Sequence, residues 1–131
     1  MAKTDLLSMA RSSRYHARAY LFVQQGLDFT VRQEHGDIDE SEDPRLHESR
    51  HVTGKQLCNG LRDLALKEYG LMARTVLGRW NIHSCADFGR IVFSMVEAGL
   101  MRKTQDDRMK DFADAYDFDE AFTSQLSLTE N

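Results

Sequence analysis

The chain has 131 residues and a net charge of −4, with 41% hydrophobic and 29% charged residues. This length allows one domain with a sizeable core, and the composition is that of an ordinary globular protein rather than a disordered one. No apolar run approaches the roughly 18 residues that a membrane-spanning helix needs, and the first residues lack the hydrophobic stretch of a secretory signal, so we expect a cytoplasmic protein with no membrane partner.

The first part of the chain predicts one long helix between two polar segments. Residues 1–12 are expected to be a flexible N-terminus, because they lack hydrophobic periodicity. Residues 13–36 predict an amphipathic helix that packs on the rest of the domain, because apolar residues recur at helical spacing. They form two stripes: Tyr20, Val23, Leu27 and Val31, and Tyr15, Ala19, Phe22 and Phe29. The alternative is a hairpin joined at Gly26. Residues 37–50 follow as an acidic, proline-interrupted linker.

The next segment predicts three helices. Thr53 and Gln56 have the spacing of a capping box, and Gly70 is expected to end the first of these helices. A shorter helical segment, "LMARTVLGRW", follows it. Ser84 is expected to cap the third helix, which ends at Gly99. The predicted buried face of the third helix consists of Phe88, Ile91, Val92, Met95 and Val96.

Two short strands are expected after these helices. The segments "LMRKT" and "FADAYDF" can pair around the polar turn "QDDRMKD", because aromatic residues in the second segment alternate with smaller or charged ones. Residues 123–131 are expected to be a flexible tail. The predicted fold class is therefore mainly α with a small β-hairpin: a winged-helix-like domain over residues 51–122, preceded by the long amphipathic helix.

Two resemblances accompany these patterns. The stretch "VLGRWNIHSCADFGRIVFSMVEAGLMRK" resembles the core of bacterial winged helix-turn-helix regulators, with Ile82 just after the turn, a serine cap, and "EAGL" leading into the first wing strand. The segments "RHVTGKQL", "YGLMARTVLGRW", "DFGRIVFSMVEAGLMRKT" and "YDFDEAF" resemble an uncharacterised family of small proteins restricted to Planctomycetes and Verrucomicrobia, over most of the chain from Tyr15 to Phe122. That family has no assigned activity, so the resemblance implies no catalytic or binding residue.

The third helix suits a protein partner better than a nucleic acid. Its outward side is predicted to hold Cys85, Ala86, Gly89, Arg90, Phe93, Ser94 and Glu97. Only Arg90 on this side is a good contact for a base or a phosphate, whereas an outward Phe93 suits a protein interface. The alternative for Phe93 is packing under the N-terminal helix.

The leading functional prediction is a non-catalytic protein–protein interaction module on a winged-helix scaffold, which binds another protein or itself through Phe93, Phe22 and Arg90. The alternative is a nucleic-acid-binding transcriptional regulator. Residues 50–103 carry nine Lys and Arg against four Asp and Glu, a net charge of +5, but the charges of the predicted wing nearly cancel. The regulator would use Arg74, Arg79, Arg90, Arg102 and Lys103.

No catalytic, metal or cofactor site is predicted. Cys58 and Cys85 belong to no C-x-x-C pair and are expected to be buried, reduced thiols. The stretch "DIDESEDPRLHE" matches an EF-hand loop at several positions, but Glu42 stands where that loop needs a glycine. His47 and His51 have a metal-binding spacing with no assured third ligand. Since no activated nucleophile or phosphate-binding loop is found either, we expect no enzyme activity, cofactor or small-molecule substrate.

Overall fold

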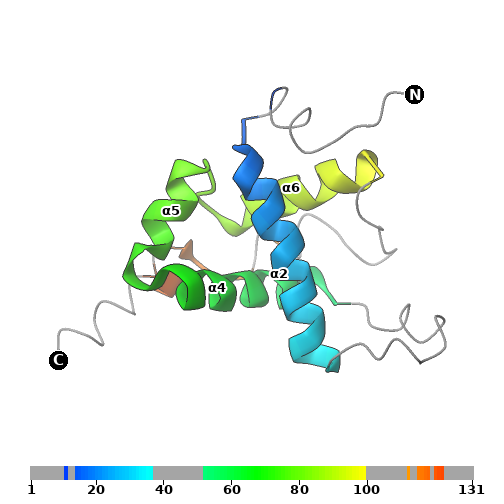
Figure 1. Cartoon of the computed structure of the whole chain (residues 1–131), viewed down its shortest axis with the longest axis horizontal. Coiled ribbons are helices and arrows are strands. Elements are labelled where there is room, and N and C mark those ends of the chain that lie inside the picture. The colour runs from blue at the N-terminus through cyan, green and yellow to red at the C-terminus, as the bar shows by residue number, and fades with distance from the viewer. Residues whose placement is uncertain are drawn as a thin grey trace.

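Four α-helices and one 3-10 turn make up the elements of the described part of the chain. The structure is a computed structural model, and it describes residues 11, 14–36, 52–99, 112, 115–118 and 120–122. The elements are α2 (Ala17–His35), α4 (Gly54–Tyr69), η1 (Gly70–Met72), α5 (Ala73–Arg79) and α6 (Cys85–Glu97). Figure 1 shows α2 lying across α4 and α6, with α5 next to α4.

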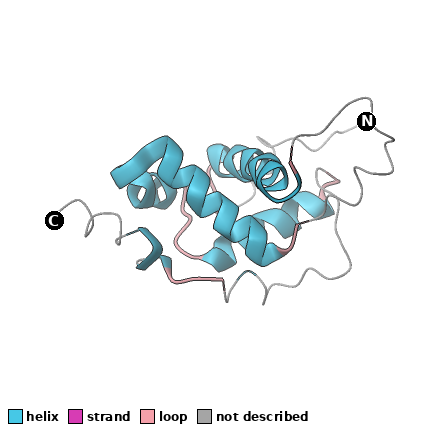
Figure 2. Cartoon of the chain, turned by 90° about the horizontal axis from the view of Figure 1, so that it is seen from below, coloured by secondary structure: helices cyan, strands magenta, loops and turns pink. Residues whose placement is uncertain are grey.

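The predicted β-hairpin is wrong, and so is the winged-helix-like fold class that contained it. None of the described residues lies in a strand, and Figure 2 draws them as helices and loops. Where the second strand was predicted, residues 115–117 are irregular, and residues 118 and 120–122 are helical. The aromatic spacing explains the error, because Phe118 and Phe122 are four residues apart and their rings pack edge to face, 5.1 Å between centroids, as on one side of a helical turn. The first predicted strand, residues 100–104, lies outside the described residues.

A long helix does precede the rest of the domain, and it excludes the alternative hairpin at Gly26. α2 begins after His16, whose ring Nδ1 accepts a hydrogen bond from the backbone N–H of Arg18 at 3.0 Å and so caps the helix. Tyr15 therefore precedes the helix, although it is buried in the same core. The buried residues of α2 are Ala19, Tyr20, Phe22, Val23, Gly26 and Thr30.

Two glycines allow α2 and α4 to cross at close range. A β-carbon added to Gly60 would lie 1.8 Å from Thr30 Oγ1, and one added to Gly26 would lie 2.0 Å from Leu61 Cδ2. Neither position has room for a side chain, so the close approach of the two helices requires glycine there. The Thr30 hydroxyl donates a hydrogen bond to the carbonyl oxygen of Gly26 at 2.6 Å, which satisfies this buried polar group. The crossing therefore fixes the position of α2 on the domain.

The predicted capping box at the start of α4 is confirmed. The Thr53 hydroxyl accepts a hydrogen bond from the backbone N–H of Gln56 at 3.0 Å, and the Gln56 side chain accepts one from the Thr53 N–H at 2.8 Å. Gln56 Nε2 also donates to Glu34 at 3.0 Å, which links the start of α4 to the end of α2. Gly70, with a φ of 53°, ends the helix as predicted, because this left-handed backbone conformation favours glycine.

α6 is more completely covered than its sequence predicts. Its predicted buried residues Phe88, Ile91, Val92 and Met95 are buried, and Val96 is half-buried. Cys85 and Gly89, which were predicted to face outward, are buried as well. The segment at residues 115–118 explains part of this difference, because the Cys85 thiol donates a hydrogen bond to the Tyr116 carbonyl oxygen at 3.4 Å. The Phe118 ring lies beside α6 too, 5.5 Å from the Phe88 ring.

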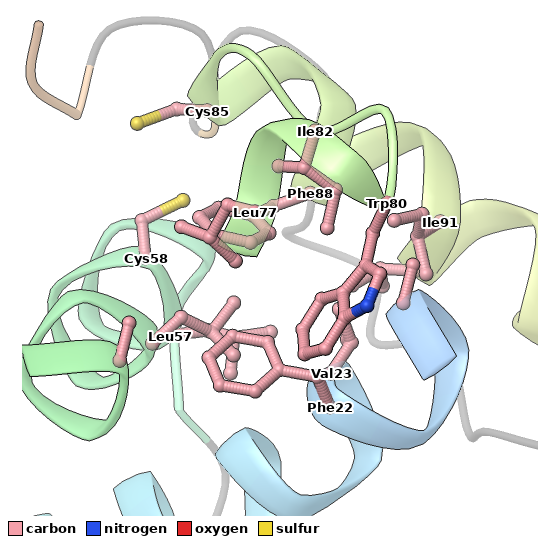
Figure 3. Close-up of a cluster of buried hydrophobic side chains, with 14 of the residues drawn as sticks. Phe22, Val23, Leu57, Cys58, Leu77, Trp80, Ile82, Cys85, Phe88 and Ile91 are labelled. Atoms are coloured by element: carbon pink, nitrogen blue, oxygen red, sulfur yellow. The ribbon is translucent and has the colours of Figure 1, made fainter. Parts of the chain in front are cut away.

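One hydrophobic core joins the four helices (Figure 3). Side chains from every helix point into it, among them Phe22, Val23, Leu57, Leu77, Phe88 and Ile91. Full burial of a side chain of this size contributes about 1.5–3 kcal/mol to the free energy of unfolding. None of the described helices has both the length and the apolar character that crossing a membrane requires.

Candidate functional site

A groove lies where α2 passes the ends of α4 and α5. Its lining comes from α2, from the last turn of α4 and from the residue directly after α5: Arg18, Leu21, Phe22, Gln25, Glu68, Tyr69 and Trp80. The groove has a volume of about 290 Å³, at the lower end of the range for small-molecule pockets. Since several of its lining residues are aromatic, we call it the aromatic groove.

Three aromatic rings form the floor of the aromatic groove. The ring centroids of Phe22 and Trp80 are 5.6 Å apart, those of Tyr69 and Trp80 are 5.9 Å apart, and those of Phe22 and Tyr69 are 6.4 Å apart. The rings are tilted or edge to face, which are arrangements in which aromatic side chains attract each other. Trp80 is only 9% exposed, so the floor is packed before any partner arrives. A preformed surface of this kind avoids part of the entropic cost of ordering side chains on binding.

The turn after α5 holds Trp80 in this position. The Trp80 backbone N–H donates to the carbonyl oxygen of Leu77 at 3.0 Å, and Asn81 then takes a φ of 72°, a left-handed conformation that asparagine tolerates. Two hydrogen bonds tie this turn to the residues before α2. The His16 N–H donates to the Trp80 carbonyl oxygen at 3.4 Å, and Asn81 Nδ2 donates to the Arg14 carbonyl oxygen at 3.0 Å. The same turn therefore positions both the floor and the start of α2.

Exposed apolar side chains lie in the aromatic groove and in the 3-10 turn that follows α4. Within the described part of the chain, the large hydrophobic residues that are exposed are Leu21, Leu71 and Met72, at 48%, 51% and 57%. Leu21 lines the groove, while Leu71 and Met72 belong to η1 and closely follow the groove residue Tyr69. Methionine is flexible and adapts its shape to a contacting surface. An exposed leucine that lines a groove is typical of a protein interaction surface when further apolar side chains are exposed close by.

A buried carboxylate joins the segment before α2 to the start of α6. Asp87 Oδ1 accepts hydrogen bonds from the Tyr15 hydroxyl at 2.5 Å and from the Arg90 guanidinium at 2.8 Å, and Oδ2 accepts one from the His83 backbone N–H at 2.8 Å. Ser84 occupies the capping position of α6, but its side chain makes no capping hydrogen bond. Its hydroxyl lies 3.5 Å from Asp87 Oδ2. Asp87 is thus a structural anchor between these two segments.

The hydrogen bonds around Asp87 determine its protonation state. Burial favours the neutral acid, but the bonds from Tyr15, from the His83 backbone and from Arg90 outweigh it and hold the pKa of Asp87 below its ordinary value. Burial, followed by the hydrogen bond to Asp87, raises the pKa of Tyr15 to about 12. At neutral pH the pair therefore consists of a charged carboxylate and a neutral hydroxyl that donates to it.

Of the three predicted partner-binding residues, Phe22 lies in the floor of the aromatic groove, and the other two do not line it. Phe93 is half-buried and packs edge to face on Phe112, with 5.9 Å between ring centroids. Arg90 is exposed on α6, but its guanidinium is held by Asp87. The roles of Phe93 and Arg90 in partner binding stay predictions.

The predicted nucleic-acid-binding residues lie partly within and partly outside the described residues. They are Arg74, Arg79, Arg90, Arg102 and Lys103, of which the last two lie outside the described residues. The Arg74 guanidinium lies over the Phe118 ring, 5.5 Å from its centroid, and Arg90 is bonded to Asp87. Arg79 is exposed at the end of α5. With the winged scaffold contradicted, nucleic-acid binding stays a prediction that no described arrangement of these residues supports.

The other sites weighed in the sequence fall into two groups. The EF-hand-like segment and the histidines at 47 and 51 lie outside the described residues. Over the ranges that are described, no three or more His, Cys, Asp or Glu side chains come together in a way that could hold a metal ion. Cys58 and Cys85 are buried and free, as predicted.

Sequence reasoning missed most residues of the aromatic groove. Leu21, which lines the groove, falls on neither of the two apolar stripes of α2. The available signal for the groove was therefore an apolar residue on a side of α2 that the hydrophobic periodicity predicts to be exposed. Tyr69 and Trp80 gave no such signal, because each reads as an ordinary helical residue until the fold brings them together.

Comparison of the chain with protein-family models, with curated proteins and with solved structures gave no match. The resemblance to the family restricted to Planctomycetes and Verrucomicrobia therefore stays a prediction, as does the cytoplasmic location.

Proposed function

We propose that this protein is a non-catalytic interaction module that binds protein through the aromatic groove and the apolar residues beside it, and that a second copy of the chain is its partner. The observation that carries this proposal is the exposed Leu21 in a groove whose aromatic floor is already packed, together with the exposed Leu71 and Met72 of the turn that follows α4. Aromatic and methionine side chains are enriched in the centres of protein interfaces. Burying these exposed side chains provides a favourable free energy of about 25 cal/mol per Å² of apolar surface.

Opposite charges on the two walls of the aromatic groove support a second copy as the occupant. Arg18 stands on the α2 wall and Glu68 on the α4 wall, and both are exposed. In a twofold-symmetric pair each copy presents the same surface to the other, so Arg18 of one copy can face Glu68 of the other, and this contact occurs twice. Charges at the rim of an interface govern orientation and association rate more than affinity. The apolar contact would therefore supply most of the affinity.

Analytical ultracentrifugation of the full chain over a concentration series tests this proposal. We expect a monomer–dimer equilibrium with a dissociation constant of about 1–100 µM, because three apolar side chains and a small groove offer less surface than a standard interface. Leu21→Asp and Met72→Asp should each raise the dissociation constant at least about tenfold, since each places a charge in the apolar contact.

Gln33→Asp is the matched control for Leu21→Asp. It adds the same charge to an exposed position of α2, about 18 Å further along the helix, and is expected to leave association unchanged. Arg18→Glu should weaken the dimer, and the double variant Arg18→Glu/Glu68→Arg should restore it. A chain that stays monomeric at every concentration would rule out a second copy as the partner. Equal effects of Leu21→Asp and Gln33→Asp would move any interface away from the groove.

A further inference from the structure

Two thiols that are distant in the sequence lie together at the edge of the core. Figure 3 shows Cys58 of α4 and Cys85 of the first turn of α6 with their sulfur atoms in the same space between the two helices. They are close enough for the Cys58 thiol to donate a hydrogen bond to the Cys85 sulfur. Tyr116 contacts both residues: its hydroxyl donates to the Cys58 carbonyl oxygen at 2.8 Å, and its own carbonyl oxygen accepts from the Cys85 thiol at 3.4 Å. Tyr116 therefore links the two cysteines through its hydrogen bonds to both.

A cavity of about 280 Å³ gives access to this pair from the side of Cys85. Arg74, His83 and Asp117 line it together with Cys85. Because Cys85 is only 1% exposed, a reagent must be small enough to enter the cavity and approach the sulfur closely. Hydrogen peroxide is little larger than water, which occupies about 30 Å³, whereas a bulky peptide disulfide would not reach the thiol. The geometry thus selects a small hydroperoxide as the oxidant.

The two thiols differ in acidity. The hydrogen bond from Cys58 lowers the pKa of Cys85, although burial and the negative charge of Asp117 oppose this. The same hydrogen bond, together with burial, raises the pKa of Cys58. Cys85 also occupies the first position of α6, where the positive end of the helix dipole favours a thiolate. Cys85 is therefore the stronger nucleophile of the two.

We propose that Cys85 and Cys58 form a peroxide-reactive pair, in which Cys85 is oxidised first and Cys58 then closes a disulfide with it. The Cys85 sulfur attacks one oxygen of hydrogen peroxide, so that an S–O bond forms and the O–O bond breaks; the second oxygen leaves as water with the proton that the Cys85 thiol released. The Cys58 sulfur then attacks the Cys85 sulfur, so that an S–S bond forms and the S–O bond breaks, and the departing hydroxide leaves as water with the Cys58 proton. Two thiols and one peroxide give one disulfide and two waters.

Treatment of the full, reduced chain with hydrogen peroxide tests this proposal. We expect both thiols to disappear together, the intact mass to fall by two hydrogen atoms, and the chain to run as a monomer on a denaturing, non-reducing gel. Dithiothreitol should restore both thiols. Oxidation should be faster in the folded chain than in the chain unfolded by urea, because the lowered pKa of Cys85 in the folded state raises its thiolate fraction.

Two single substitutions test the order of the steps. In Cys58→Ala, the sulfenic acid on Cys85 should accumulate and be trapped by dimedone, whereas in Cys85→Ala the Cys58 thiol should stay unmodified under the same conditions. Rapid oxidation of Cys58 in Cys85→Ala would overturn the proposed order. Persistence of both thiols in the folded wild-type chain, or equal rates in the folded and the unfolded chain, would overturn the proposal as a whole. These wild-type measurements decide it even where a variant fails to fold.

Discussion

Replacing Gly60 with alanine is expected to lower the free energy of unfolding by about 2–3 kcal/mol, although alanine is the better helix former by about 1 kcal/mol. The added β-carbon would lie 1.8 Å from Thr30 Oγ1 and 2.8 Å from Thr30 Cβ. Thr30 is fully buried, so its side chain has no free space to turn into, and α2 has to move away from α4. Urea unfolding followed by circular dichroism measures this loss.

Gly78→Ala is the control for this change, because Gly78 also lies in a helix but has open surroundings. A β-carbon there would meet its nearest neighbours, Arg74 and His83, at 3.6 Å and 3.7 Å, which are ordinary contacts. This variant should therefore gain up to about 1 kcal/mol from helix propensity alone. In a Thr30→Gly background, Gly60→Ala should cost less by about 1–2 kcal/mol, since the clashing atoms are gone. If Gly60→Ala stabilised the protein as Gly78→Ala does, the helices would not cross as closely as described.

Replacing Asp87 with alanine is expected to cost about 3 kcal/mol of unfolding free energy at neutral pH. Three donors lose this acceptor: the Tyr15 hydroxyl, the His83 backbone N–H and the Arg90 guanidinium. Tyr15 precedes α2 and His83 precedes α6, so the loss weakens the contact between the starts of these two helices. Asp87→Asn keeps the shape of the side chain and should cost less. A loss of less than about 1 kcal/mol in Asp87→Ala would show that the junction does not depend on this carboxylate.

The pH dependence of unfolding separates the charge of Asp87 from its shape. Because the pKa of Asp87 is lowered in the folded state, the unfolded chain binds this proton at a higher pH, and stability falls as the pH drops below about 4. In Asp87→Asn this acid loss should be smaller. Tyr15, with its pKa raised to about 12, stabilises the fold below pH about 10, and this contribution disappears as the pH rises toward 12. Tyr15→Phe should reduce the alkaline loss without removing it, because the pKa values of Tyr116 and Cys58 are raised in the folded state as well. Acid sensitivity from other carboxyl groups should stay in place.

Features that depend on residues close together in the sequence could be predicted. Each end of α4 is determined by residues close together in the sequence. The helix begins with the Thr53–Gln56 capping box and ends at Gly70, as predicted. Most of the buried face of α6 follows from helical spacing in the same way. The hairpin failed because the spacing from Tyr116 to Phe118 suggested alternation, whereas the four-residue spacing from Phe118 to Phe122 governs the packing.

Contacts between distant segments were beyond such prediction. Asp87 lies only three residues after the capping position Ser84, whereas its hydrogen-bond partner Tyr15 lies 72 residues away. Of the groove floor, only Phe22 was proposed as a binding residue, because Tyr69 and Trp80 reach it from the ends of different helices. The pairing of Cys58 with Cys85 likewise exists only once α4 and the first turn of α6 are packed together.

Trp80 is the only tryptophan of the chain, and its indole lies in the floor of the groove between the rings of Phe22 and Tyr69. When tryptophan is excited selectively, the fluorescence of this protein therefore originates from a single, nearly shielded chromophore. A red shift of its emission would report solvent entry on denaturation, while a change in intensity at constant wavelength would report contact at the groove, so one optical trace distinguishes loss of the fold from occupation of the surface.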